Sequence, residues 1–258
     1  MSDGFGDQVF QLARRSVVRT ARQPANVIGP LVFPLMLLAV NSGGLRAETH
    51  LPGFPTRSFF AFALAVPFIQ GALFSTMNAG TDLARDIQSG FLNRLSLTPM
   101  RPVALLAGQL GGVVALGLIQ AVVYLSVGFA VGVRFASGPV GVLVLLAFSF
   151  LVTLGFGALG AFTALRTGSG EAVQGMFPLF FVFLFISSMN IPRNLIGVTW
   201  FRDAATINPV SYLIECVRSL VITGWNGEAL ALGFTVAAVV AMASVTLSTR
   251  ALRTRMAR

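Results

Sequence analysis

Long runs of apolar residues dominate this chain and restrict the folds open to it. Several of them extend over about twenty residues, the length at which an α-helix crosses the hydrocarbon core of a bilayer. The 258-residue sequence is 55% hydrophobic and only 10% charged, whereas soluble domains carry about a quarter charged residues. We therefore expect an all-α polytopic membrane protein, built as a single membrane domain over residues 1–258 without a separate soluble domain.

The apolar runs predict six transmembrane helices. Their approximate ranges are 26–40, 58–80, 103–133, 139–165, 172–189 and 228–249. The first run is short and contains Pro30 and Pro34, which fits a tilted helix or a locally thinned bilayer. Within the fourth run, Gly155, Gly157 and Gly160 match the spacing GxGxxG. Because no strand precedes them, we interpret these glycines as a packing face and not as a nucleotide site.

Residues 5–22 have the pattern of an amphipathic helix. Apolar side chains such as Val9 and Leu12 share one arc, and Arg14 and Arg15 lie on the opposite arc. This pattern is typical of a helix that lies in the membrane interface with its arginines toward anionic lipid. We therefore expect an N-terminal interfacial helix in contact with membrane lipid.

Residues 191–224 are partly apolar but unsuited to a full crossing. Asn208-Pro209 breaks the segment, and Glu215 and Arg218 follow it three residues apart on one helical face, where they can pair. An arginine at the centre of a membrane costs about 2.5–3.5 kcal/mol on insertion scales. A seventh crossing would also place the two ends of the chain on opposite sides. We therefore expect a re-entrant pair of helices at the outer surface.

The arginines set the predicted orientation. The net charge is +9 without a single lysine, and the arginines lie at the ends of the spans and in the tails, not on one folded face as in a nucleic-acid-binding protein. With both termini in the cytoplasm, the inner arginines are those at positions 14, 15, 19, 22, 85, 94, 101, 166, 250, 253, 255 and 258, and the outer ones are those at 46, 57, 134, 193, 202 and 218. This distribution follows the positive-inside rule. We also expect the chain to lie in the plasma (inner) membrane of a bacterium.

Several kinds of catalytic and metal site are excluded by missing residue types. The phosphate-binding loop GxxxxGK[ST] requires a lysine, which the sequence lacks. His50 is the only histidine and Cys216 the only cysteine, so neither a Cys/His metal cluster nor an internal disulfide can form. We expect no catalytic residue, no metal and no cofactor in this chain.

The segment 82–102 interrupts the apolar runs with charge and turns. Within it, apolar residues recur at helical spacing, and prolines end the short helix before the next span; these residues are Ile87, Phe91, Leu92, Leu95, Pro99 and Pro102. A short helix between two spans has no lipid in which to bury this face. It therefore needs either a protein partner or the headgroup region of the membrane.

The residues of this segment resemble the cytoplasmic coupling loop of type-2 ABC exporter membrane subunits. The resemblance rests on Asp86, Gly90-Phe91-Leu92, Arg94-Leu95 and Thr98-Pro99, and the Gly-Phe-Leu form is most similar to the daunorubicin-resistance branch. It implies a coupling helix that docks into an ABC ATPase subunit, with contacts from Asp86, Gly90, Phe91, Leu92, Arg94, Leu95 and Pro99. This sequence departs from the family at Asn93, where that branch usually has an acid, and at Gln88, where the wider family often has one.

The resemblance extends to two further loops. It implies a minor ATPase contact at the second cytoplasmic loop, where Arg166 and Glu171 lie. It also implies an external re-entrant segment like the one that contains Asn208, Pro209, Glu215 and Arg218.

The predicted spans contain few polar residues. The second to fifth hold no charged residue away from their ends, although ion-coupled carriers usually keep one in the membrane interior. This favours an energy source outside the chain. The remaining polar residues Gln70, Asn78, Gln120 and Tyr124 either line a substrate path or form interhelical hydrogen bonds.

Taken together, the resemblance implies a half-transporter that exports an amphipathic drug, lipid or glycolipid. Two copies, or this chain and a homologous membrane subunit, would pair with two ATPase subunits that hold ATP and magnesium. The alternatives are an ATP-independent carrier or channel, and a scaffold that assembles other membrane proteins.

Overall fold

A computed structural model describes residues 5–21, 24–91 and 102–256 of the chain. Within these ranges the secondary structure is helical, with no strand. The elements are α1 (Phe5–Ala21), α2 (Pro24–Gly44), η1 (Arg46–His50), α3 (Phe59–Ala63), α4 (Ala65–Gln88), α6 (Pro102–Ala130), α7 (Gly138–Thr167), α8 (Gly170–Gln174), α9 (Met176–Phe185), η2 (Arg193–Leu195), α10 (Thr199–Ile207), α11 (Pro209–Arg218), η3 (Ser219–Thr223, a π turn) and α12 (Gly227–Met256). The predicted all-α membrane fold is confirmed.

Within the described part of the chain, five segments are long and apolar enough to cross a membrane: Val27–Gly44, Phe59–Gln88, Val103–Ala130, Gly138–Thr167 and Gly227–Met256. The predicted fifth span, 172–189, corresponds to the shorter apolar segment Gly170–Phe185. This segment is split into α8 and α9 at Gly175. Its 16 residues would extend about 24 Å as one helix, less than the hydrocarbon thickness of about 30 Å. The count of six transmembrane helices therefore stays a prediction.

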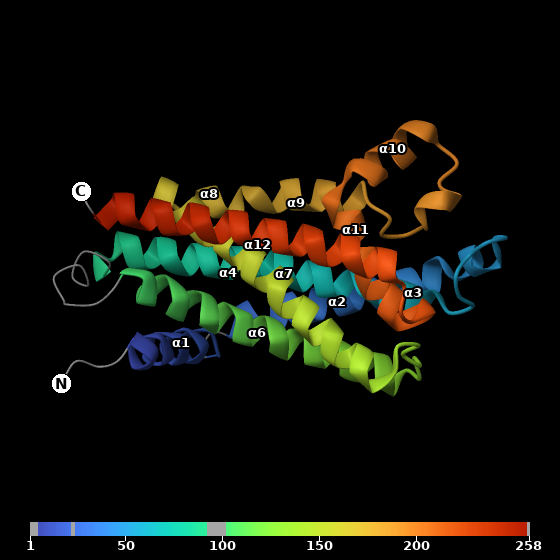
Figure 1. The fold of residues 1–258 in the computed structure, drawn as a ribbon, viewed down its shortest axis with the longest axis horizontal. Coiled ribbons are helices and arrows are strands. Elements are labelled where there is room, and N and C mark those ends of the chain that lie inside the picture. The colour runs from blue at the N-terminus through green and yellow to red at the C-terminus, as the bar shows by residue number, and fades with distance from the viewer. Residues whose placement is uncertain (1–4, 22–23, 92–101, 257–258) are drawn as a thin grey trace.

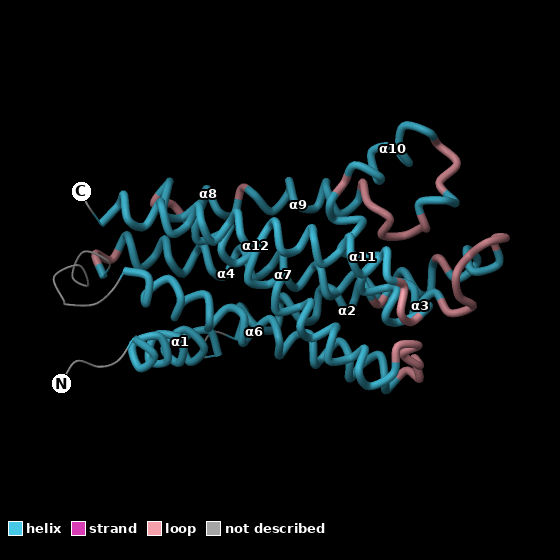
Figure 2. Tube along the Cα trace, in the orientation of Figure 1, coloured by secondary structure: helices cyan, strands magenta, loops and turns pink. Residues whose placement is uncertain are grey.

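The long helices form an elongated bundle with two distinct ends (Figure 1). The start of α1, the last turn of α4, the loop between α7 and α8, and the end of α12 gather at one end, called here the terminal end. The opposite or distal end carries η1, α10 and the turn between α6 and α7, and Figure 2 shows that the longer loops lie there. Both ends of the described chain thus lie at the same end of the bundle, as a chain with both termini on one side of a membrane requires.

The helix α4 forms the centre of the bundle. Most of its residues are buried, and it packs against α2, α6, α7, α8 and α11. It continues without interruption to Gln88, so residues 82–88 of the predicted coupling loop 82–102 are the end of a spanning helix. Asp82, Leu83 and Ala84 are buried there. Leu83 and Ala84 belong to one apolar cluster with Leu165 of α7 and Val173 of α8, so the helix continues through its charged residues.

The glycines of α7 are a packing face, as the sequence predicted. A Cβ atom on Gly155 would lie 3.0 Å from the backbone nitrogen of Ala241 in α12, and one on Gly160 would overlap the carbonyl group of Thr76 in α4. The hydroxyl of Thr76 also donates a hydrogen bond of 2.9 Å to the carbonyl oxygen of Phe156. The missing side chains therefore let α7 approach two neighbouring helices closely.

Candidate functional site

The predicted coupling residues begin at the last turn of α4. Gly90 follows it with a φ of +67°, a left-handed conformation that ends a helix and that glycine adopts without strain. Asp86 and Phe91 face the same neighbour, Arg15 in α1. The Arg15 Nη2 atom lies 3.5 Å from Asp86 Oδ1, and its guanidinium group lies over the Phe91 ring, 4.0 Å from the centroid.

Arg15 is a contact that the sequence analysis missed, because it lies more than 70 residues from its partners and no local pattern joins them. The other predicted coupling residues, Leu92, Arg94, Leu95 and Pro99, lie outside the described residues. Among the described residues, the start of the predicted coupling segment is therefore in contact with α1.

A pair of glycines in α6 holds α1 in this place. A Cβ atom on Gly108 would overlap Leu12, and one on Gly112 would overlap Ser16. Gly108 and Gly112 therefore form the surface of α6 on which α1 packs, and Ser16 is buried in this contact. Residues 5–21 are helical as predicted, and the placement of α1 in a membrane interface stays a prediction.

The second predicted loop lies beside the end of α4. Gly168, with a φ of +71°, ends α7, and Ser169 caps α8 by accepting a hydrogen bond of 3.2 Å from the backbone nitrogen of Ala172. The Ser169 hydroxyl also donates to the carboxylate of Glu171, which lowers the pKa of that exposed side chain. The Gln88 side chain donates to the carbonyl oxygen of Gly168 at 3.1 Å. The two predicted cytoplasmic loops are therefore joined, while Arg166 is exposed.

At the distal end, Asn208 connects two helices. Its Oδ1 atom accepts a hydrogen bond of 2.9 Å from the backbone nitrogen of Val210, which caps α11, and Pro209 takes the first helical position. Its Nδ2 atom donates to the carbonyl oxygens of Phe183, at 2.5 Å, and Ile186, at 3.0 Å, at the end of α9. Asn208 and Pro209 therefore define where α11 begins.

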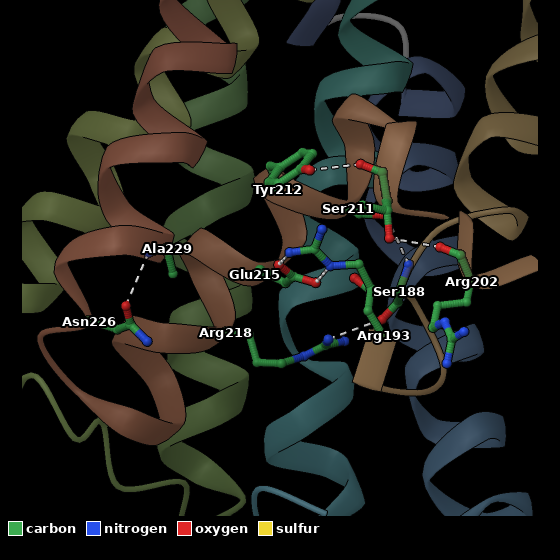
Figure 3. Close-up of polar contacts among 10 residues, drawn as sticks. Ser188, Arg193, Arg202, Ser211, Tyr212, Glu215, Arg218, Asn226 and Ala229 are labelled. Atoms are coloured by element: carbon green, nitrogen blue, oxygen red, sulfur yellow. Dashed lines mark hydrogen bonds and ion pairs between the residues drawn. The ribbon is translucent and has the colours of Figure 1, made fainter. Parts of the chain in front are cut away.

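The predicted pairing of Glu215 with Arg218 is wrong. Glu215 instead forms a bidentate ion pair with Arg193 of η2, with Nε–Oε1 at 2.7 Å and Nη2–Oε2 at 2.6 Å (Figure 3). Arg193 also lies over the ring of Tyr212, 4.6 Å from its centroid. Burial alone would lower the pKa of Arg193, but the hydrogen bonds and negative charge of Glu215 raise it overall. The planar guanidinium fork matches a carboxylate in this geometry, which outweighs the shorter sequence separation of Arg218.

Arg218 is buried and directs its donors at backbone carbonyls. Nε donates to Phe62 at 3.3 Å, Nη1 to Ser188 at 3.0 Å and Nη2 to Met189 at 3.0 Å. Its guanidinium group also lies over the Phe62 ring, 3.5 Å from the centroid. Arg218 thereby joins α11 to α3 and to the segment that follows α9.

A cavity of about 560 Å³, called here the outer pocket, opens between these groups. It lies at the distal end, between α3, η2, α10, α11 and the start of α12. Its charged lining residues are Arg193, Arg202, Glu215 and Arg218.

The predicted path residues come together only in part. Gln120 and Tyr124 in α6 lie against Gly71 in α4, around a space of only about 10 Å³. Tyr124 donates a hydrogen bond to a backbone carbonyl of α2, the second of the two roles that the sequence allowed. Gln70 is buried in α4 and Asn78 is half-buried on the same helix. A path role for Gln70, Asn78 and Gln120 stays a prediction.

Comparison with known proteins shows the family to which this chain belongs. The profile of the family described as ABC-2 type transporter matches residues 7–222. The chain belongs to the ABC-2 type transporter family. It is 30% identical to the daunorubicin resistance ABC transporter permease DrrB1 of Streptomyces coeruleorubidus. The aligned 200 residues cover 75% of this chain and 66% of that protein. It is 25% identical over 226 residues to a doxorubicin resistance ABC transporter permease, DrrC, of Mycobacterium tuberculosis, covering 85% of this chain and 79% of that protein.

The ABC-2 match confirms the resemblance seen in the sequence, including the similarity to the daunorubicin-resistance permeases. Members of this family are membrane-spanning permease subunits of ABC transporters and lack an ATPase site of their own. The matched residues 7–222 contain both the predicted coupling segment, which begins at the end of α4, and the outer pocket's α10 and α11 at the distal end.

Proposed function

We propose that this chain is the membrane subunit of an ATP-driven exporter, with its ABC ATPase docked at the terminal end. The exporter moves an amphipathic drug, lipid or glycolipid out of the cytoplasm or the inner leaflet of a bacterial plasma membrane. Both termini are cytoplasmic in this arrangement, and a second copy or a homologous membrane subunit completes the transporter.

The observation that carries this proposal is the continuity of the coupling segment with α4. Only Ser89 and Gly90 separate the end of α4 from Phe91, and Arg15 contacts both Phe91 and Asp86. A partner that binds around Phe91 therefore acts directly on the most central helix of the bundle.

The same helix leads toward the distal end. It packs against α11, the helix that contains Glu215 and Arg218, and Arg218 is bonded to the carbonyl oxygen of Phe62 just before α4 begins. A displacement that starts at the terminal end can therefore reach the outer pocket through packed backbone, without a flexible loop between them.

The experiment is to replace Phe91 with Asp and to purify the chain from membranes of its own host. Phe91→Asp puts a charge into the docking surface and leaves the spans unchanged, so the chain should insert normally but lose its ABC ATPase and its export activity. Thr254→Asp is the matched control, because Thr254 is exposed at the same end on α12. Normal export by Phe91→Asp would favour an ATP-independent carrier instead.

A further inference from the structure

We propose that the outer pocket binds the anionic group, a phosphate or a carboxylate, of an amphipathic molecule at the membrane surface. This assigns a ligand site and a ligand class to the distal end. It deepens the proposed function, on which its role in export rests, but the binding itself requires no ATPase.

The charges of the outer pocket favour an anion. Three arginines and one glutamate line it, and they come from three elements: η2 supplies Arg193, α10 supplies Arg202, and α11 supplies Glu215 and Arg218 (Figure 3). The bidentate pair neutralises Arg193 and Glu215 against each other. Arg202 and Arg218 remain without a carboxylate within ion-pair distance among the described residues, so the pocket has an excess of two positive charges.

The most unusual group in the outer pocket is Arg218. It is only 7% exposed, and a buried cation without a paired anion is costly unless polar groups surround it. Three carbonyl oxygens and the Phe62 ring partly stabilise it and hold its plane in one orientation. A guanidinium group has five N–H donors, so two remain after these three bonds. A fixed, incompletely paired guanidinium at a cavity wall is the arrangement that recognises a phosphate or carboxylate.

The tryptophans indicate the depth at which the outer pocket lies. The sequence contains two, and both flank its lining: Trp200 on α10 precedes Arg202 by two residues, and Trp225 is adjacent to Asn226. Trp200 is 69% exposed and Trp225 is 56% exposed. Exposed tryptophans in membrane proteins concentrate at the level of the lipid headgroups, which is the depth at which the charged group of an amphiphile lies.

The tail of such a molecule has an apolar surface beside the pocket. Val198 and Ile207, at the two ends of α10, are 53% and 82% exposed. An amphiphile can therefore place its charged group among the arginines while its chain stays along α10 in the lipid. The pocket would at the same time disfavour cationic amphiphiles, since they would meet two unpaired arginines.

The test measures binding of fluorescently labelled phosphatidic acid to the purified full-length chain in a neutral detergent, with no ATPase present. Phosphatidylcholine, which is zwitterionic, should bind about tenfold more weakly, the difference expected from one charge-assisted hydrogen bond. Arg202→Gln, at an exposed position, should weaken phosphatidic acid binding by a similar factor. Glu215→Gln should strengthen it, because it removes the negative charge and frees Arg193.

Arg46→Gln is the matched control, since Arg46 is an exposed arginine at the same end and does not line the outer pocket; its affinity should equal that of the unchanged chain. Inorganic phosphate is added as a competitor to identify the source of the anion. Competition at millimolar concentration would assign a soluble anion, and binding of the lipid alone would assign a headgroup. Equal binding by Arg202→Gln, or a weakening by Glu215→Gln, would overturn the proposal. These results are independent of the Phe91→Asp experiment, which concerns only the terminal end.

Discussion

The hydroxyl of Tyr124 in α6 donates a hydrogen bond of 2.9 Å to the carbonyl oxygen of Pro30 in α2. This carbonyl has no helical donor, because the residue four positions later is Pro34, which lacks an N–H group. The Tyr124 side chain therefore replaces the hydrogen bond that the proline removes, at a site where both Tyr124 and Pro30 are buried.

Tyr124→Phe should destabilise the protein by about 1–3 kcal/mol, since it leaves a buried carbonyl without a donor. Thermal unfolding in detergent, followed by circular dichroism, measures this change. Tyr212→Phe is the control: its hydroxyl bonds to the carbonyl oxygen of Thr206 at an exposed site and should contribute less. Equal effects of the two changes would contradict this explanation.

Gly160→Ala should be the more disruptive of two glycine changes. Its methyl group would overlap the Thr76 carbonyl, and the resulting separation of α7 from α4 should cost about 1–3 kcal/mol. Gly43→Ala in α2 meets nothing within 4 Å and should be neutral or stabilising, because alanine favours a helix. Unfolding temperatures of the two variants check this, and a Gly160→Ala variant as stable as the parent would contradict the close approach.

The ion pair between Arg193 and Glu215 should show strong coupling in a double-mutant cycle. Both side chains are about a quarter exposed, so a coupling free energy of about 1–3 kcal/mol is expected from the single changes Arg193→Gln and Glu215→Gln and their combination. The same cycle between Glu215 and Arg218 should give a smaller value. The reverse order would restore the pairing that the helical spacing suggested.

Arg15→Gln tests whether the contact of α1 with Asp86 and Phe91 stabilises the fold or positions the predicted coupling segment. Arg15 is 44% exposed at its side chain, so its loss should lower the free energy of unfolding by less than about 1 kcal/mol. In the ATP-driven exporter proposed above, ATP hydrolysis should nevertheless respond less to substrate, because Asp86 and Phe91 lose their contact with α1. Arg14→Gln, a change at the adjacent exposed arginine, provides the comparison. A full response in Arg15→Gln would mean that the contact does not position the coupling segment.

Reporter fusions test the orientation. Fusions after Arg258 and at Gly168 should read cytoplasmic, and one at Phe201 should read external. The structure motivates this because the loop at Gly168 and the end of α12 lie together at the terminal end, whereas α10 lies at the distal end. An external reading after Arg258 would require a further crossing and a different topology.

Apolar length predicted most of the bundle because a membrane imposes it directly on the sequence. The runs predicted the five segments of crossing length that the described residues contain. Asn208-Pro209 marked the start of α11 because both residues act locally on the backbone. The break at Gly175 was missed, since a glycine in an apolar run leaves mean hydropathy almost unchanged.

Sequence patterns did not predict which residues distant in the chain contact one another in the fold. The spacing of Glu215 and Arg218 describes one helix, whereas Arg193 approaches Glu215 from a separate turn. Likewise, the spacing of Gly108 and Gly112 is typical of a close helix–helix contact, but only the folded arrangement identifies the partner as α1. In both cases tertiary packing determines which residue or helix makes the contact.

The contact between Gly160 and Thr76 brings two backbones together with no side chain between them. Side chains act as compliant spacers, because they can change rotamer and absorb a small relative movement; here there is no such spacer. Sliding of α4 along α7 would need the two helices to separate first. The unit that responds to a push on α4 is therefore the rigid pair of α4 and α7, and the compliant surfaces of the transporter must lie around that pair.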